Sequence, residues 1–167
     1  MQDTLPIHFA PLQGYTEAIY RNAHDAFFGG VDTYYTPFVR LEKGNFRRRD
    51  VRGIEPENNG VTHLIPQLIA SSAEKAEVIL SLFIEKGYQE VDINLGCPFP
   101  LLAKRHNGSG ILPYPEEVKA LLSIVTRYPQ ISFSVKMRLG WEQPDECLAL
   151  APILNDLPLR QITMHPR

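Results

Sequence analysis

Short apolar runs alternate along the chain with longer segments in which apolar residues recur every three or four positions. The short runs are typical of buried β-strands, and the longer segments are typical of amphipathic helices. Six runs are predicted to be strands, at residues 7–12, 32–39, 62–69, 90–95, 131–138 and 160–165. This alternation indicates repeated βα units.

Start and stop signals bound two of the predicted helices. One helix, over residues 71–86, opens with serines that suit an N-cap and ends at Gly87. The other begins at Pro115, carries two glutamates in its first turn and stops before Pro129. Two further helices are predicted at 16–28 and 144–155. The polar segment 42–59 is predicted to be a loop with a short helix.

Strands joined by helices of this length must run parallel, which leaves a doubly wound sheet or a (β/α)₈ barrel. The end of the first predicted strand and the residues after it read Pro-Leu-Gln-Gly-Tyr at 11–15, which is not the GxGxxG turn of dinucleotide-binding sheets, and this favours the barrel. A complete barrel has eight strands in about 250 residues. We therefore expect an α/β fold: an incomplete (β/α)₈ TIM barrel of about six parallel strands with helices outside.

The composition is that of an ordinary globular chain, with 44% hydrophobic and 22% charged residues among 167. The net charge of −2 gives no overall basic field, so any nucleic-acid contact must be local. Cys97 and Cys147 lie far apart without metal-ligand spacing, which predicts neither a disulfide framework nor a metal site. With no signal-peptide pattern and no long apolar run, we expect a cytoplasmic protein without a membrane span.

Polar residues follow or end each predicted strand, where an apolar residue would be usual. They are Gln13, Arg40, Gln67, Asn94, Cys97, Lys136, Arg138, His165 and Arg167. Because the carboxyl ends of parallel strands share one rim, these residues are expected to meet at one mouth. Taken singly, Gln67 and Asn94 could be buried groups with satisfied hydrogen bonds and His165 could be structural, but their joint placement favours a functional site.

Cys97 stands between Gly96 and Pro98 directly after a predicted strand, which predicts a sharp turn that presents the thiol. Since a thiol is mostly protonated near neutral pH, it could act as a general acid, and as a thiolate it could be a nucleophile. Cys147 lies among leucines in a predicted helix, which predicts a buried structural thiol.

Two polar segments leave alternatives open. The glycine-containing stretch at 105–110 could be a mobile flap over the mouth or an ordinary loop. The arginines at 47–49 and 52, near Lys43, could bind phosphates or form a solvated charged face.

Several segments, in order and spacing, resemble the tRNA-dihydrouridine synthase family. They are APLQGYT at 10–16, PQL at 66–68, DINLGCP at 92–98, GSGIL at 108–112, VKMRLGW at 135–141 and HPR at 165–167. The segments around Cys97 and Lys136 are highly specific, whereas the first would be weak alone.

The resemblance implies an FMN-dependent TIM barrel that reduces uridine in tRNA to 5,6-dihydrouridine and uses NADPH to reduce the flavin. The residues that would line the flavin are Pro11, Gln67, Lys136 and His165. Lys136 would face the N1 and O2 side of the ring, where negative charge develops. Asn94 and Arg138 would hold the flipped uracil, and Cys97 would protonate C5 while flavin N5 delivers hydride to C6.

Members of this family are longer and add a helical tRNA-binding domain. We therefore expect residues 1–167 to be a single truncated catalytic domain, weak or inactive alone. TIM barrels commonly bind phosphate through the loops after strands 7 and 8, so we expect the chain to bind FMN weakly or not at all. Exposed barrel edges are expected to pair into a homo-oligomer. The alternatives are an FMN enzyme similar to dihydroorotate dehydrogenases that acts on free pyrimidines, and a non-catalytic interaction or RNA-binding half-barrel.

Overall fold

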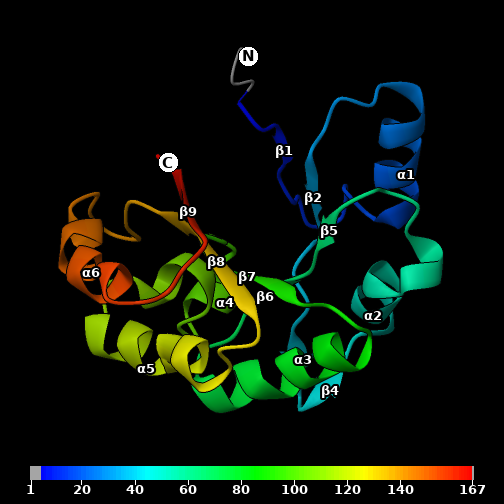
Figure 1. Ribbon diagram of the computed structural model, residues 1–167. Helices are drawn as coiled ribbons and strands as arrows, with labels where there is room; N and C mark the ends of the chain where they lie inside the picture. Colours follow the sequence, from blue (N-terminus) through cyan, green and yellow to red (C-terminus); the bar gives the residue numbers. More distant parts are fainter. Residues whose placement is uncertain (1–4, 167) are drawn as a thin grey trace. The chain divides into compact units, whose positions relative to one another are not determined.

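The computed structural model describes residues 5–166, which fall into two compact units divided between Gln67 and Leu68 (Figure 1). In both units, parallel strands alternate with helices, which confirms the predicted α/β class. Arg167, predicted to lie at the mouth, is outside the described residues.

The first unit is built on three short parallel strands in the order β1-β2-β5. Its elements are β1 (His8–Phe9), α1 (Ala18–Phe27), β2 (Thr33–Tyr35), β3 (Leu41–Glu42), β4 (Asn45–Phe46), α2 (Arg48–Ile54), a 3₁₀ turn η1 (Pro56–Asn58) and β5 (Leu64–Ile65). A fully buried arginine, Arg21 of α1, connects two loops of this unit and helix α2. It donates hydrogen bonds to Thr16 O at 2.6 Å, Gly53 O at 2.8 Å and Asn59 Oδ1 at 2.5 Å.

The hairpin formed by β3 and β4 was not predicted, because the segment 42–59 was expected to be a loop with a short helix. The short helix is present as α2, but an antiparallel hairpin precedes it. Lys43 and Gly44 make its turn with φ values of +50° and +79°, the conformation of a type I′ turn. A lysine at the first of these positions is a weak sequence signal for such a turn.

The second unit carries a sheet in the order β6-β7-β8-β9. Its elements are β6 (Gln67–Leu68, at the boundary), α3 (Ala73–Glu85), β7 (Glu90–Leu95), α4 (Pro100–Ala103), a 3₁₀ turn η2 (Gly108–Ile111), α5 (Pro115–Arg127), β8 (Ser132–Arg138), α6 (Glu146–Asn155) and β9 (Gln161–His165). Ser72 caps α3, as predicted, by accepting a hydrogen bond from Lys75 N. Within residues 5–166, no helix has both the length and the apolar character needed to cross a membrane.

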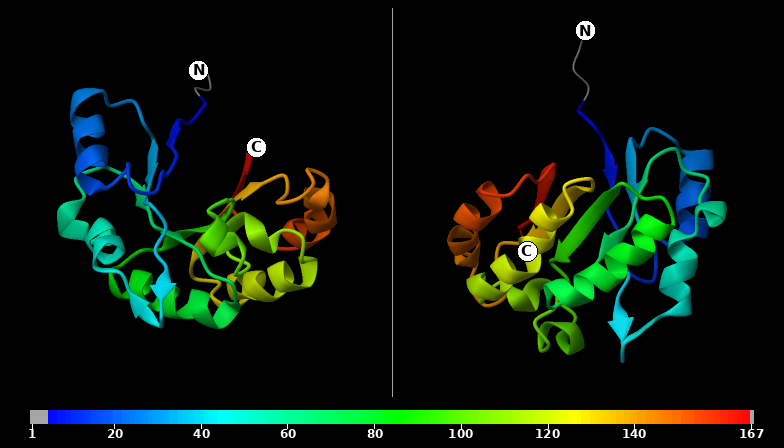
Figure 2. Two further views of the ribbon diagram at one scale, coloured as in Figure 1. Left: turned by 180° about the vertical axis from the view of Figure 1, so that it is seen from behind. Right: turned by 60° about the horizontal axis from the view of Figure 1, so that its bottom comes forward.

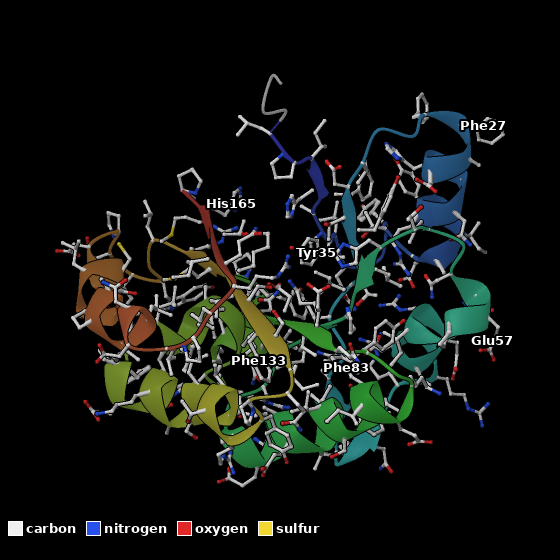
Figure 3. All side chains as sticks on the ribbon, in the orientation of Figure 1. Phe27, Tyr35, Glu57, Phe83, Phe133 and His165 are labelled. Atoms are coloured by element: carbon white, nitrogen blue, oxygen red, sulfur yellow. The ribbon has the colours of Figure 1, made fainter. Side chains whose placement is uncertain are left out.

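Alternate residues of β7 and β8 give this sheet one apolar and one polar face, because successive side chains of a strand point to opposite sides. The apolar face carries Val91, Ile93, Leu95, Phe133, Val135 and Met137, all buried. Helices α3 and α5 lie side by side against this sheet (Figures 1 and 2). Figure 3 shows Phe83 of α3 and Phe133 of β8 among these helices, and His165 projecting from the end of β9. Burial of each large apolar side chain stabilises the unit by about 1.5–3 kcal/mol.

Candidate active site

The polar face of the second-unit sheet is arranged in rows across three strands. Residues paired in a parallel sheet share a face, and the register gives the rows Asp92–Ser134–Gln161, Asn94–Lys136–Thr163 and Arg138–His165. The last two rows lie toward the carboxyl ends of the strands. Four residues predicted from sequence to share a mouth are therefore on one face of one sheet.

The turn that carries Cys97 is fixed to this face by hydrogen bonds. Asn94 Oδ1 accepts from Gly96 N at 3.0 Å and from Cys97 N at 2.9 Å. Arg138 Nε donates to Gly96 O at 3.0 Å, which ties the turn to the end of β8. Cys97 therefore follows β7 at the same end of the sheet as Arg138 and its register partner His165.

A second support reaches Cys97 from η2. Cys97 O accepts hydrogen bonds from both N and Oγ of Ser109, each at 3.0 Å. Gly108 lies so close that a Cβ added to it would be 2.6 Å from Cys97 O. The backbone of Cys97 is thus held at its N–H by Asn94 and at its carbonyl by Ser109.

The stretch 105–110, for which a mobile flap was one alternative, is held in place by contacts. Gly108, Ser109 and Gly110 are buried in η2. His106 Nδ1 is 2.7 Å from Glu117 Oε2, and its ring stacks on Tyr114 with centroids 4.1 Å apart. These contacts favour the ordinary-loop alternative, because burial and hydrogen bonding make the segment a support for the Cys97 turn.

The surroundings of the polar face shift the pKa values of Lys136 and His165. Burial lowers the pKa of the half-buried Lys136, the charge of Asp92 opposes this by raising it, and Arg138 lowers it further. The pKa of His165 is also lowered, first by loss of solvent around the ring and then by the charges of Lys136 and Arg138. The imidazole is exposed, so protein atoms remove only part of its solvent. The neutral form of His165 is favoured near pH 7 because its ordinary pKa is already about 6.5.

Glu146 shapes the loop that follows β8. Its carboxylate accepts hydrogen bonds from the backbone N–H groups of Trp141 at 2.7 Å, Glu142 at 2.9 Å and Gln143 at 2.9 Å. The loop lines a cavity of about 200 Å³ together with Arg138 and Pro166. Glu146 therefore fixes the backbone at one side of Arg138.

Four predicted mouth residues belong to the first unit: Gln13, Arg40, Gln67 and, from the flavin set, Pro11. Gln67 is 1% exposed, and its N–H donates to Thr36 Oγ1 at 3.0 Å. Pro11 follows β1 and is half-buried, and Arg40 Nη2 is 3.6 Å from Glu42 Oε1. A shared flavin site for Pro11 and Gln67 with the second-unit residues stays a prediction.

The prediction that Cys147 is a buried thiol in the middle of a helix is wrong. Cys147 lies in the first turn of α6 and is half-buried, and its Sγ is 3.2 Å from Pro144 O. The neighbouring Leu148 is 71% exposed, so this turn presents apolar residues to solvent.

Carboxylates lie close to part of the basic segment in the first unit. Arg47 Nε is 3.9 Å from both Glu42 Oε2 and Asp50 Oδ1, and Arg49 Nε is 3.7 Å from Glu17 Oε1. Burial raises the pKa of Asp50, while Arg47 and Arg49 lower it. These carboxylates offset part of the positive charge of the basic segment. Contact of the segment with RNA phosphates stays a prediction.

Four residues that support this site were not predicted from the sequence: Asp92, Ser134, Ser109 and Glu146. A signal for the first two was present, because Asp92 and Asn94 alternate with apolar residues, as do Ser134, Lys136 and Arg138. Such a period of two indicates one polar face of a strand. No comparable pattern marks Ser109 or Glu146, whose partners depend on how the loops fold.

Comparison with known proteins places the chain in a family. Residues 8–167 match the family model described as dihydrouridine synthase. A probable tRNA-dihydrouridine synthase 1 of Synechocystis sp. is 28% identical over 165 residues, which are 95% of this chain and 44% of that protein. A tRNA-dihydrouridine synthase B of Pasteurella multocida is 24% identical over 162 residues, 96% of this chain and 48% of that protein.

A tRNA-dihydrouridine synthase B of Klebsiella pneumoniae is 29% identical over 102 residues, 60% of this chain and 32% of that protein. The chain therefore spans less than half the length of each of these three relatives. Because the family model covers nearly the whole chain, the chain belongs to the dihydrouridine synthase family.

Proposed function

We propose that this chain carries the catalytic and flavin-binding residues of a tRNA-dihydrouridine synthase, which reduces uridine in tRNA to 5,6-dihydrouridine. One observation carries the proposal beyond the family match: the Cys97 turn is hydrogen bonded to both Asn94 and Arg138, on the polar face that also holds Lys136 and His165. A proton donor and several hydrogen-bond donors therefore share one end of one sheet, as reduction of a pyrimidine requires.

The residues present fit FMN, the cofactor proposed here. Lys136 and Arg138 offer cationic donors from one face, which suits the electron-rich edge of a flavin ring. Partial burial of Lys136 strengthens such contacts by lowering the local dielectric.

When bound, reduced FMN would supply the hydride that C6 of the uracil receives. Asn94 uses Oδ1 to hold the Cys97 turn, so its Nδ2 hydrogens are the donors that it offers to a uracil carbonyl. Arg138 holds the same turn through Nε, and its Nη groups are the donors proposed to orient the base. Cys97 then donates its thiol proton to C5, and because Cys97 is half-buried, the thiolate can regain a proton from solvent.

The substrate and partners follow from the same proposal. We propose tRNA as the substrate, with the target base extruded from its stack, NADPH as the reductant and the cytoplasm as the compartment. The end strand β9 of the second-unit sheet exposes Ile162 and Met164, each at 41%. This supports the proposal that two copies pair through strand edges to form a homo-oligomer.

An assay with two substrates tests the proposed function. The chain is incubated with excess FMN and NADPH, so that weak flavin binding does not hide the chemistry, and with either an unmodified tRNA transcript or free orotate and uracil. We expect slow formation of dihydrouridine in the tRNA, since the chain spans less than half the length of its relatives and is expected to be weak alone, and no reduction of the free pyrimidines. Reduction of free pyrimidines would instead support a dihydroorotate dehydrogenase-like enzyme, and tRNA binding without any reduction would support a non-catalytic module.

A further inference from the structure

Asp92 is a buried carboxylate on the polar face of the second-unit sheet. Its side chain lies in the middle of β7, and the residue is 2% exposed. Ser134, which is 1% exposed, donates a hydrogen bond from Oγ to Asp92 Oδ1 at 2.5 Å. A hydroxyl donor orients a carboxylate but does not neutralise it, so a buried charge of this kind requires a cation nearby.

The cation placed to meet it is Lys136. Asp92 pairs in register with Ser134, and Lys136 is two residues further along β8, so the acid and the lysine are diagonal neighbours on one face. Diagonal neighbours in a sheet are about 7–8 Å apart, which is within reach of a long lysine side chain. The charge of Asp92 raises the pKa of Lys136, against the effects of burial and of Arg138.

Arg138, His165 and Glu90 also lie on this face, but they are not placed to be the counter-charge of Lys136. Arg138 and His165 are cationic or neutral and lie at the carboxyl end of the rows. Glu90 shares the face at the amino end of β7, but its carboxylate is 3.2 Å from Arg160 Nε. Among the described residues of β7, β8 and β9, Asp92 is thus the carboxylate positioned for Lys136.

We propose that Asp92, oriented by Ser134, is a positioning residue that holds the Lys136 side chain as an ammonium group on the polar face. Burial and the Arg138 charge both favour a neutral, displaced amine, and the Asp92 carboxylate counteracts both. For catalysis, the inference rests on the proposed function, since a cationic Lys136 is what a flavin edge that gains negative charge would need.

The titration of Lys136 tests this inference without flavin or substrate. The Lys136 amine is followed by NMR in isotope-labelled chain across pH, with Lys136→Met used to assign its signal. We expect Asp92→Asn to lower the pKa by about one unit, which is a tenfold larger neutral fraction at a given pH. Asp92→Glu should restore most of the shift, and the matched control Glu90→Gln on the same strand should leave the titration unchanged. An Asp92→Asn shift no larger than that of Glu90→Gln would overturn the inference.

The midpoint of urea unfolding provides a second, independent test of the pairing between Asp92 and Lys136. In the parent chain, Asp92→Asn should lower the midpoint of urea unfolding because it removes the partner of Lys136. In the Lys136→Met background it should raise the midpoint, because the buried carboxylate that it removes then no longer faces the Lys136 ammonium. If Asp92→Asn alone does not fold, the double variant should still fold and be more stable than Lys136→Met. The same direction of change in both backgrounds, or a double variant less stable than Lys136→Met, would contradict the pairing.

These measurements separate the two proposals. If the chain fails to reduce tRNA but Asp92→Asn still lowers the pKa of Lys136, the proposed function fails and the positioning role stands. If tRNA is reduced and the titration is unchanged, the positioning role alone fails.

Discussion

Replacement of Cys97 by alanine should reduce the formation of dihydrouridine by about 10²–10⁴-fold, the usual contribution of a positioned general acid. The reason is chemical: C5 of the uracil must receive a proton, and the Cys97 thiol is the donor that we propose, on the turn held by Asn94 and Arg138. The measurement is single-turnover reduction of an unmodified tRNA transcript with excess FMN and NADPH.

Two controls make this result specific to the proton transfer. Affinity for tRNA, measured by filter binding, should change less than twofold, because the backbone bonds that fix the turn do not involve the thiol. Cys147→Ala should keep normal turnover, since Cys147 lies in the first turn of α6 and contacts Pro144. Turnover by Cys97→Ala at the parent rate would remove Cys97 from the mechanism.

Replacement of Gly108 by alanine should destabilise the second unit by about 2–5 kcal/mol, the sum of overpacking and left-handed backbone strain. The added Cβ would lie 2.6 Å from Cys97 O and 2.9 Å from Cys97 Cβ, and the φ of Gly108 is +61°. Either the unit loses stability or the Cys97 turn moves, and both would reduce turnover. Urea unfolding of the chain measures the first effect.

Gly87 provides the matched control for this substitution. It also belongs to the second unit and has a positive φ of +85°, but an added Cβ would meet no atom within 4 Å. Gly87→Ala should therefore show the backbone strain alone, about 1–2 kcal/mol. An equal loss of stability in the two variants would show that close contact with Cys97 does not matter at Gly108.

Most of the fold could be predicted from periodicity. The segment 90–95 is β7 itself, and the segments 131–138 and 71–86 differ from β8 and α3 by one or two residues at their ends. Their patterns are clear because each element buries one whole face. With the family match, the expected class, an incomplete TIM barrel with parallel strands and helices, is confirmed.

Other features depend on contacts that no local pattern encodes. The predicted strand at 62–69 is two short strands on either side of Pro66, which has no N–H for a sheet ladder. Ser109 supports Cys97 from 12 residues away, and this bond exists only because η2 folds back onto the turn. The sequence therefore predicted which residues gather at the strand ends, but not the groups that hold them in position.

The central claim is that the polar face of β7, β8 and β9 is where the flavin and the uracil meet. The most direct measurement is a crystal structure of this chain grown with FMN at high concentration. We expect the flavin ring against this face, with Lys136 Nζ within hydrogen-bond distance of the N1 and O2 edge and the Cys97 thiol beside the ring. A flavin ring bound without contact to Lys136 or His165 would contradict the claim.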